Sequence, residues 1–106
     1  MEAALRAIAE PRRRQILALV RDRELPAGQI ASRFRITRPA ISQHLRVLKD
    51  AGLLTERRDG TRRYYRARPE GLEELRKFLD AMWTSGFDRL KAAAEDEERS
   101  RRGRRH

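Results

Sequence analysis

The stretch TRPAISQHLRVLKDAG, from Thr37 to Gly52, constrains the fold of this chain more than any other. If a helix begins after Thr37, then Ile41, Leu45 and Leu48 recur at i, i+4 and i+7 and form one apolar face. The threonine hydroxyl can cap the first turn, the nearby proline is tolerated there, and Gly52 suits the left-handed residue that follows a helix. The stretch therefore predicts a capped amphipathic helix that packs on a core.

The other side of this predicted helix, residues 38–51, is a polar arc. Its hydroxyl, amide and cationic side chains are of the kinds that contact base edges and phosphates in DNA. Most amphipathic helices simply expose such a face to water, so the arc alone leaves a solvated surface as the alternative. The arc comprises Arg38, Pro39, Ser42, Gln43, Arg46, Lys49 and Asp50.

The charge balance favours a polyanionic partner. The 106 residues include 26 Lys+Arg against 16 Asp+Glu, which gives a formal net charge of +10. Nearly all the basic residues are arginine, whose forked guanidinium group binds phosphates and guanine edges bidentately. A GC-rich genome could explain arginine in place of lysine, but it does not explain the excess over acids. The length fits one domain with a modest core, which a partner subunit would help to stabilise.

Composition also excludes several kinds of chemistry. The chain has no cysteine, so disulfides, thiolate metal sites and cysteine nucleophiles are excluded. Its histidines, His44 and His106, and its acids form no catalytic constellation and no metal-ligating cluster. We therefore predict no enzymatic activity, no metal site and no cofactor. No stretch resembles a signal peptide or approaches the ~20 apolar residues of a membrane span, which predicts a cytoplasmic protein without membrane contact.

Three shorter helices are predicted ahead of the capped helix. Residues 3–9 form the first, with Leu5 and Ile8 on one face, and Pro11 begins the second because proline suits a first helical turn. The third covers GQIASRF, residues 28–34, and a tight turn joins it to the capped helix. Two helices joined in this way have the arrangement of a helix-turn-helix.

Three consecutive arginines, Arg12 to Arg14, fall at the start of the second predicted helix. Cations at a helix N-terminus oppose the helix dipole, so a nearby phosphate or acidic side chain would stabilise them. A run of solvated charges is the alternative interpretation.

A β-hairpin is predicted over residues 54–67, after the capped helix. Asp59-Gly60 lies between two polar, β-tolerant segments and is typical of a type I′ turn, in which both central residues have positive φ. With these two residues as the loop, Leu54 lies opposite Tyr65, and both side chains can point to the core.

Four arginines crowd the tip of this predicted hairpin, where like charges repel one another unless an anion is near. As a wing, the hairpin would contact phosphates or the minor groove. Charged residues that protect an exposed strand edge are the alternative. The four are Arg57, Arg58, Arg62 and Arg63.

A long helix of about 40 Å is predicted from Pro69 to residue 95. Its apolar side chains recur at spacings of three and four over a length that so small a domain cannot cover, which predicts packing against the same helix of a second copy. Aromatic residues that line a ligand pocket are the alternative. With the first helix, the predicted dimer interface comprises Leu5, Ile8, Leu75, Leu79, Met82, Trp83, Gly86 and Leu90.

The domain organisation follows from these elements. We predict one DNA-binding and dimerisation domain over residues 1–95 and a disordered charged tail over residues 96–106, which lacks apolar residues. Four helices, two strands and a final helix follow one another along the chain. The predicted fold class is mainly α with a small β-hairpin, a winged helix-turn-helix.

With its elements in this order, the chain resembles the ArsR/SmtB family of bacterial winged-helix repressors. The most similar motifs are AEPRRRQILALV at residues 9–20, RPAISQHLRVLKDAGLL at residues 38–54 and the hairpin RRDGTRRYYRA. The resemblance implies a homodimer whose recognition helices enter successive major grooves of a palindromic operator on double-stranded DNA and repress transcription. It implies base contacts by Ser42, Gln43 and Arg46 and phosphate contacts by Arg38 and Lys49.

The resemblance does not extend to metal sensing. Metal-sensing members carry cysteines in the helix before the recognition helix, where this chain has LPAGQIASRF, or acid and histidine ligands along the terminal helix. The terminal helix here has Asp80, Asp88 and Glu95 but no histidine. We therefore expect a non-metal-sensing repressor, released by an unknown small-molecule effector, by a partner protein or by a change in expression. His44 matches the family motif but borders the apolar face, where a buried hydrogen-bonding role is expected.

Two other functions remain open at this point. The arginine content alone also fits a non-specific DNA-coating protein, which would show steep salt dependence and no preferred site. The polar arc could instead bind an acidic protein surface, as in a winged-helix protein-interaction module that retards no DNA.

Overall fold

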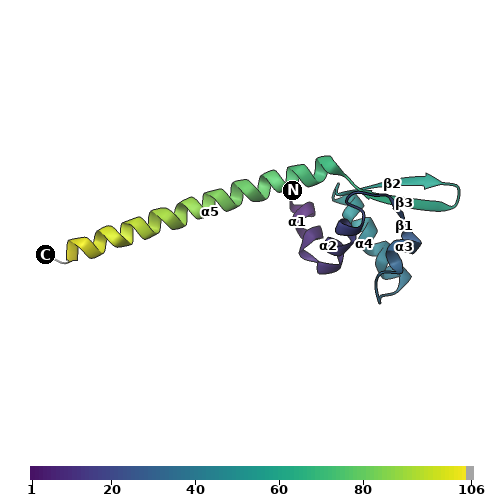
Figure 1. The fold of residues 1–106 in the computed structure, drawn as a ribbon, viewed down its shortest axis with the longest axis horizontal. Coiled ribbons are helices and arrows are strands. Elements are labelled where there is room, and N and C mark those ends of the chain that lie inside the picture. Colours follow the sequence, from purple (N-terminus) through teal and green to yellow (C-terminus); the bar gives the residue numbers. More distant parts are fainter. Residues whose placement is uncertain (105–106) are drawn as a thin grey trace. The chain divides into compact units, whose positions relative to one another are not determined.

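The computed structural model describes residues 1–104, and side chains through Arg101, in two compact units. The first unit covers residues 1–75 and holds four helices, a small sheet and the first turns of α5 (Figure 1). The second unit, which begins at Arg76, consists of the rest of α5. The mainly helical fold with an antiparallel hairpin confirms the predicted fold class.

The first two helices, α1 (Glu2–Ala9) and α2 (Pro11–Leu19), are separated by Glu10. The backbone of Glu10 is extended, and its carboxylate accepts a hydrogen bond from the backbone N–H of Arg12 at 3.3 Å. This contact satisfies one of the free N–H groups at the start of α2. The predicted start of α2 at Pro11 is therefore confirmed.

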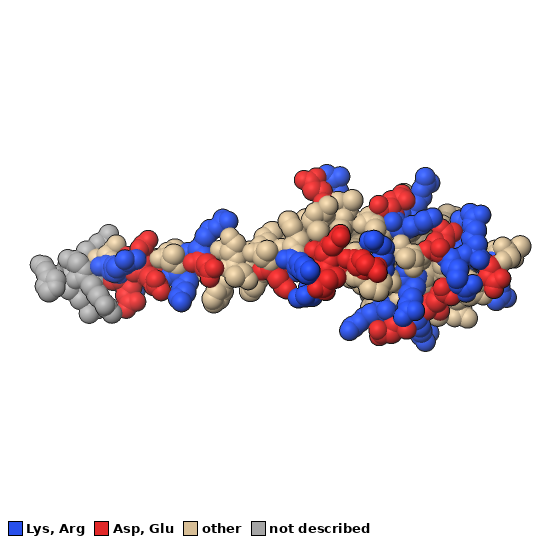
Figure 2. Space-filling view, turned by 90° about the horizontal axis from the view of Figure 1, so that it is seen from above, with Lys and Arg blue, Asp and Glu red and all other residues tan. Residues whose placement is uncertain are grey.

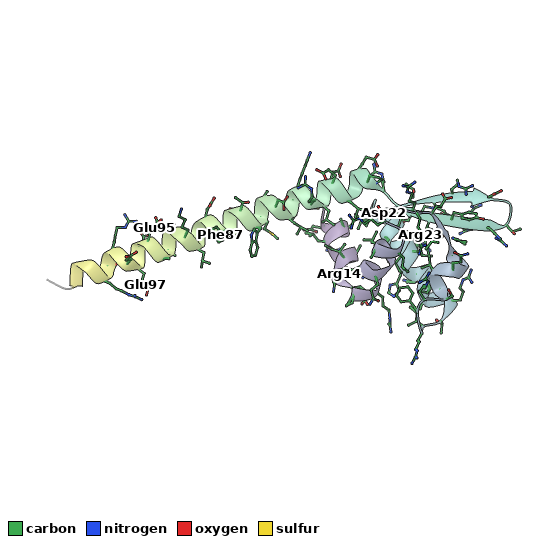
Figure 3. All side chains as sticks on the ribbon, in the orientation of Figure 1. Arg14, Asp22, Arg23, Phe87, Glu95 and Glu97 are labelled. Carbon is green, nitrogen blue, oxygen red and sulfur yellow. The ribbon has the colours of Figure 1, made fainter. Side chains whose placement is uncertain are left out.

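Two of the three arginines at the start of α2 donate hydrogen bonds within the protomer. Arg14, labelled in Figure 3, donates from Nη1 to the carbonyl oxygens of Ile8 and Ala9 at 2.6 and 3.2 Å. Arg13 donates from Nη2 to the carbonyl oxygen of Arg6 at 3.4 Å. These carbonyls belong to the C-terminal turn of α1, where they lack partners within the helix. The run thus caps the preceding helix, and its position needs no external anion.

The helix-turn-helix consists of α3 (Ala27–Ala31) and α4 (Arg38–Asp50). The Thr37 hydroxyl oxygen accepts a hydrogen bond from the backbone N–H of Ala40 at 3.2 Å, which confirms the predicted cap of α4. α3 is shorter than predicted, and Phe34 lies half-buried in the turn that follows it. No residue of this turn has positive φ, so the turn forms without a glycine.

The core of the first unit lies where the apolar faces of α1 to α4 meet the sheet. The predicted inner face of α4 is confirmed, because Ile41, Leu45 and Leu48 are at most 2% exposed. The other buried apolar residues are Ala4, Ala7, Ile16, Leu17, Val20, Leu25, Ile30, Leu53, Leu54, Tyr65, Ala67 and Leu75.

The sheet has three antiparallel strands where the sequence predicts a hairpin alone. β1 (Leu25–Pro26), β2 (Leu54–Asp59) and β3 (Arg62–Ala67) lie in the order β1-β3-β2. Leu25 pairs with Tyr65 of β3. A strand of two residues that includes proline shows no alternation of apolar and polar side chains, so β1 has no signal in the sequence.

The loop of the hairpin differs from the prediction. Asp59 pairs with Arg62, so the loop residues are Gly60 and Thr61, one position later than predicted. Gly60 has a φ of 62° at the first central position, and Thr61 has negative φ, as in a type II′ turn. The predicted type I′ turn is therefore wrong, because it would force positive φ on Asp59 as well as on the glycine.

The strand register is shifted by two residues as a result. Leu54 lies opposite Ala67, not opposite Tyr65 as predicted, and Tyr65 lies opposite Glu56. A shift of two residues keeps every side chain on its original face of the sheet. Leu54 and Tyr65 are therefore both buried, as expected, and Glu56 shares their inner face.

The last helix, α5 (Pro69–Arg104), extends beyond the predicted end at residue 95. The predicted tail, residues 96–106, is helical as far as Arg104, and residues 105 and 106 lie outside the described part. Ion pairs at helical spacing, such as Glu97 with Arg101 at 2.9 Å, stabilise this segment as a helix. Despite its length, α5 is not apolar enough to cross a membrane, and neither is any other described helix.

The start of α5 lies directly against the end of α4. Gly71 is buried, and a Cβ atom on it would lie 2.0 Å from the carbonyl oxygen of Gly52, which has a φ of 77°. The adjoining backbone N–H of Arg68 donates to the carbonyl of Leu53 at 2.8 Å. Two backbones therefore meet here without a side chain between them, which only glycine at position 71 permits.

Candidate nucleic-acid interface

A groove of about 930 Å³ lies between α4, the start of α3 and the wing, which we define as residues 54–67. Lysine and arginine side chains spread over the first unit, with acids between them (Figure 2). The lining is mostly polar and comes from all three elements. It includes Gly28, Gln29, Arg38, Ser42, Arg46, Lys49, Asp50, Glu56, Thr61, Arg62 and Arg63.

The polar arc of α4 is exposed. Ser42 and Arg46 line the groove, and Gln43 is exposed beside them. The side chain of Arg46 is 82% exposed, and its ion pair with Asp50 is long, 3.9 Å between Nε and Oδ2. Exposed pairs of this kind contribute little stability. Arg46 can therefore leave Asp50 at little cost and contact another molecule.

Arg38 lies at the first turn of α4 and reaches toward α3. Its Nη1 atom is 3.5 Å from the position that a Cβ atom on Gly28 would occupy, so the guanidinium group lies beside this glycine. Among the described residues Arg38 has no ion pair and no side-chain hydrogen bond. Its donors are free for an anion such as a phosphate.

The wing arginines are not equivalent, and Arg57 is already engaged. It donates to Glu24 from Nη2 at 2.7 Å and from Nε at 3.0 and 3.1 Å, and its guanidinium carbon lies 4.6 Å from the ring centroid of Tyr64. The hydrogen bond from Arg57 is the main cause that lowers the pKa of Glu24, and the same contact raises the pKa of Arg57. Arg57 therefore stabilises the wing within the protomer.

Three of the other wing arginines, Arg58, Arg62 and Arg63, lie nearer the tip than Arg57. Arg58 and Arg63 are opposite each other on β2 and β3, and their Nε atoms lie 3.8 and 3.4 Å from Oε1 of Glu56. Arg62 lines the groove and has no ion pair with any residue that the structure describes. The protomer's own acids thus offset much of the charge at the tip. Repulsion among these arginines is therefore not by itself evidence for a bound anion.

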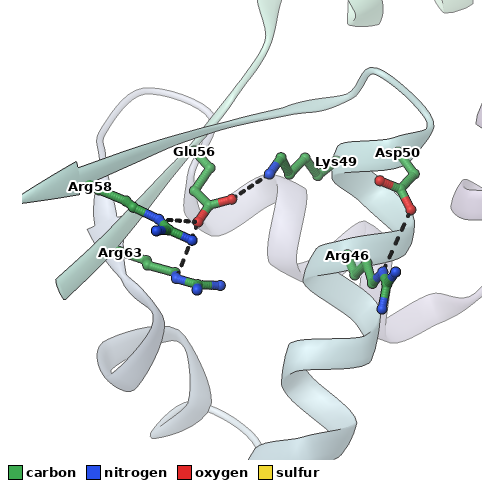
Figure 4. Close-up of polar contacts among 6 residues, drawn as sticks. All are labelled: Arg46, Lys49, Asp50, Glu56, Arg58 and Arg63. Carbon is green, nitrogen blue, oxygen red and sulfur yellow. Dashed lines mark hydrogen bonds and ion pairs between the residues drawn. The ribbon is translucent and has the colours of Figure 1, made fainter. Parts of the chain in front are cut away.

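Glu56 lies at the centre of these contacts (Figure 4). Its side chain is only 9% exposed, and Oε2 accepts a hydrogen bond from Nζ of Lys49 at 2.5 Å. Oε1 accepts no hydrogen bond from the described residues, although Arg58 and Arg63 are near. The hydrogen bond from Lys49 is the main cause that lowers the pKa of Glu56, and it outweighs the opposing effect of burial.

Sequence reasoning missed both Glu56 and Glu24. Alternation from Leu54 along β2 places Glu56 on the inner face, so a signal for it exists in the sequence. Glu24 has no such signal, because its partner Arg57 is 33 residues away. Lys49, for which the family resemblance implies a phosphate contact, donates a hydrogen bond to Glu56 in the protomer.

His44 is half-buried on α4 and does not line the groove. Burial is the main cause that lowers its pKa, and the positive charge of Arg13 adds to this effect. Its Nδ1 atom is buried and has no hydrogen-bond partner among the described residues. The expected buried hydrogen bond is therefore not made at this nitrogen.

Acidification is expected to weaken the first unit through Glu24 and Glu56. Their pKa values are lowered in the folded protein, so their contribution to stability is complete above the pKa of the unfolded chain and is lost as the pH falls through the folded pKa. We expect the free energy of unfolding of the wild type to fall more steeply in the acid range than that of the double variant Glu24→Gln, Glu56→Gln. Urea unfolding at a series of pH values measures this difference, and parallel profiles would contradict it.

A second exposed feature is an apolar stripe on the part of α5 that forms the second unit. Met82, Trp83, Phe87 and Leu90 are 56%, 75%, 58% and 69% exposed, and Phe87 points away from the helix in Figure 3. Leu79 and Gly86 continue the same face. Exposed apolar patches of this kind mark interaction surfaces.

The remaining residues of the predicted dimer interface are placed differently. Leu75 is 5% exposed and belongs to the core of the first unit, which leaves little of its surface for a second chain to cover. Leu5 and Ile8 are half-buried on α1. The acids Asp80, Asp88 and Glu95 are exposed along α5, and no group of three or more metal-ligating side chains occurs among the described residues.

Comparisons of sequence place the chain among known regulators. Residues 10–56 match the family described as bacterial regulatory protein, arsR family. The chain is 43% identical over 83 residues to the HTH-type transcriptional regulator Rv2034 of Mycobacterium tuberculosis, a match that covers 78% of each protein. It is 42% identical over 65 residues to the transcriptional repressor SdpR of Bacillus subtilis, which covers 61% of this chain and 72% of that protein.

Solved structures agree with the sequence comparison. A crystal structure of a possible transcriptional regulator for arsenical resistance matches with a TM-score of 0.74 and 47% identity, over 84% of this chain and 93% of that one. A solution NMR structure of a homodimeric winged helix-turn-helix DNA-binding domain from Mycobacterium bovis matches with a TM-score of 0.64 and 32% identity, over 78% of this chain and 77% of that one.

Together, the fold, the groove and these relatives define a winged helix-turn-helix transcriptional regulator that binds DNA. The chain belongs to the arsR family of bacterial regulatory proteins. The family resemblance found in the sequence is thereby confirmed. These two relatives are named as transcriptional regulators.

Proposed function

We propose that the protein is a homodimeric repressor that binds a palindromic operator on double-stranded DNA. In this proposal α4 enters the major groove and the wing contacts the backbone or the adjacent minor groove. The observation that carries it is the shared groove, in which the exposed arc of α4 and the wing present their donors together. The protein would act in the cytoplasm, where bacterial DNA lies.

The proposed contacts divide by chemistry. Hydroxyl, amide and guanidinium groups in the middle of α4 would read base edges, which is the role we assign to Ser42, Gln43 and Arg46. The cations at the ends of α4 and on the wing would bind phosphates. Arg57 would instead stabilise the wing within the protomer, because its guanidinium group already donates hydrogen bonds to Glu24. The phosphate contacts are Arg38, Lys49, Arg58, Arg62 and Arg63.

We further propose that the apolar stripe of α5 is the dimer interface. Large apolar side chains that are more than half exposed in the protomer lose this exposure when a second copy packs on them. The related domain from Mycobacterium bovis is described as homodimeric. A two-fold axis through the interface would present two α4 helices to half-sites one helical turn apart, about 34 Å. The interface would comprise Leu79, Met82, Trp83, Gly86, Phe87 and Leu90 of α5, together with Leu5 and Ile8 of α1.

Release from DNA would not use a metal in this proposal. The chain has no cysteine, and soft or borderline metals need thiolate or imidazole ligands. The acids of α5 alone do not supply such a set. A small apolar effector bound between the terminal helices of the two protomers is the alternative signal that we propose.

Replacing Arg46 with alanine is expected to weaken operator binding about tenfold, within the range of about 1–3 kcal/mol for a lost base contact, and to relax base preference at one position of each half-site. The operator is first selected from fragments of the organism's own genome. Dissociation constants for this site and for scrambled DNA are then measured by fluorescence anisotropy at one salt concentration.

Arg21→Ala is the matched control for this variant. It removes the same charge from a side chain that is 76% exposed and does not line the groove, so operator affinity should change little. Equal losses on operator and scrambled DNA for the Arg46 variant would show that Arg46 contacts only phosphate. Failure of the wild type to retard any DNA at low salt would overturn the proposed function.

A further inference from the structure

We propose that Glu56 is a positioning residue for DNA binding. Its carboxylate joins α4 to the wing and holds Lys49, Arg58 and Arg63 as one preformed cationic cluster, of which Lys49 and Arg63 line the groove. This inference rests on the proposed function and assigns a role to an acid within a surface that binds a polyanion. Glu56 itself would not contact the DNA.

The first support is where Glu56 lies. It follows Leu54 on the inner face of β2 and is opposite the buried Tyr65, so its carboxylate is almost enclosed. Burial of a carboxylate is costly unless a cation and hydrogen bonds compensate it. The compensating cation, Lys49, comes from a different element, α4. The ion pair therefore connects the recognition helix to the wing.

The second support is the pair of arginines beside it. Arg58 and Arg63 face each other on adjacent strands, and like charges in this position destabilise a hairpin. Glu56 lies between these two side chains and Lys49 in Figure 4, so one anion offsets the mutual repulsion of three cations. Neither arginine donates a hydrogen bond within the described residues. Their N–H groups stay available for a phosphate oxygen, and the cluster keeps a net positive charge.

Two physical effects make opposite predictions for the removal of this acid. If only charge matters, an acid in the groove repels DNA, and its loss tightens binding to every sequence. If position matters, donors held at fixed places lose less conformational entropy on binding, and their release weakens binding where the geometry is specific. The ratio of operator to non-specific affinity distinguishes the two effects.

Three variants separate charge from position. Glu56→Gln removes the charge and the ion pair with Lys49. Glu56→Asp keeps the charge but withdraws the carboxylate by one methylene group from its partner. Asp59→Asn, the matched control, removes the same charge from the same hairpin at a side chain that is 72% exposed and 4.0 Å from its partner.

We expect both Glu56 variants to lose operator affinity by about tenfold, because donors that are no longer held in place lose more conformational entropy when they bind the operator. Affinity for scrambled DNA should stay the same for Glu56→Asp and stay the same or rise for Glu56→Gln. Asp59→Asn should change both affinities in the same direction. If Glu56→Gln binds both DNAs more tightly and Glu56→Asp behaves like the wild type, the proposal is wrong and Glu56 acts only as a charge.

A second measurement needs no DNA. Because the chain has no cysteine, spin labels at Gln43→Cys and Thr61→Cys report the distance between α4 and the wing tip without background labelling. Labelled protein is mixed with excess unlabelled protein, so that only distances within one protomer are recorded by double electron–electron resonance. Circular dichroism is used to check that each variant is folded. If Glu56→Gln does not fold, the distance is measured in Glu56→Asp alone.

The distance distribution should broaden in both Glu56 variants and stay narrow in Asp59→Asn. An unchanged distribution in the Glu56 variants would overturn the positioning role, whether or not the wild type binds DNA. A wild type that binds no DNA, with broadening in the Glu56 variants, would instead overturn the proposed function and leave the link between α4 and the wing established.

Discussion

Replacing Trp83 and Phe87 with glutamate is expected to make the protein monomeric and to lower its operator affinity by at least about 100-fold, the range by which bivalent binding exceeds binding through one site. Both side chains lie in the exposed apolar stripe of α5. Two glutamates there would bring four unpaired carboxylates into a two-fold interface, where burial of each is costly. Each recognition helix would then bind its half-site alone.

Ala81→Glu with Ala92→Glu is the control for this double variant. It adds the same charge to exposed positions on the opposite side of α5, so dimerisation and operator affinity should be retained. Sedimentation at micromolar concentration measures the oligomeric state, and fluorescence anisotropy measures operator binding. A Trp83 and Phe87 variant that remains dimeric would show that the stripe is not the dimer interface. A monomer that binds the operator as tightly as the wild type would show that dimerisation is not needed.

Replacing Gly71 with alanine is expected to lower the free energy of unfolding by about 3 kcal/mol, at the upper end of the cost of overpacking a core. The new Cβ atom would lie 2.0 Å from the Gly52 carbonyl oxygen, which is backbone and cannot rotate away. The first turn of α5 and the end of α4 would have to separate. Urea unfolding followed by circular dichroism measures the loss.

Glu70→Ala is the companion variant, because it adds no atoms at the neighbouring exposed position. Its free energy of unfolding should stay within about 0.5 kcal/mol of the wild type, as for most surface substitutions. Equal stability of Gly71→Ala and the wild type would mean that the first turn of α5 can move away from α4 without loss of packing.

Much of the fold could be predicted because its signals are local. The helix after Thr37 has its cap and apolar period within a few turns, so its start and inner face were predictable. β1 depends on pairing with a segment that is distant in the sequence, and the hairpin register depends on the type of turn that joins β2 to β3. Leu25 is a strand residue only because Tyr65 lies beside it, and the turn type depends on which residue adopts positive φ. The pairing of β1 and the type of hairpin turn are therefore determined by tertiary structure and not by the local sequence.

The candidate site was predictable to a similar extent. A helical wheel gives the exposed arc of α4, but it does not show which cations the protein itself already binds. Arg57 and Lys49 each have an acid as partner, and those acids come from other elements. The arginine run of α2 likewise bonds to carbonyls of α1. Counting charges along the sequence therefore overestimates the cations that are free for DNA.

The contact between Gly52 and Gly71 has a mechanical consequence. Where side chains separate two helices, a small displacement of one is absorbed when those side chains change rotamer. Here the Gly52 carbonyl and the Gly71 backbone are in direct contact, and no side chain lies between them to absorb a displacement. A shift of the first turn of α5 is therefore transmitted to the end of α4.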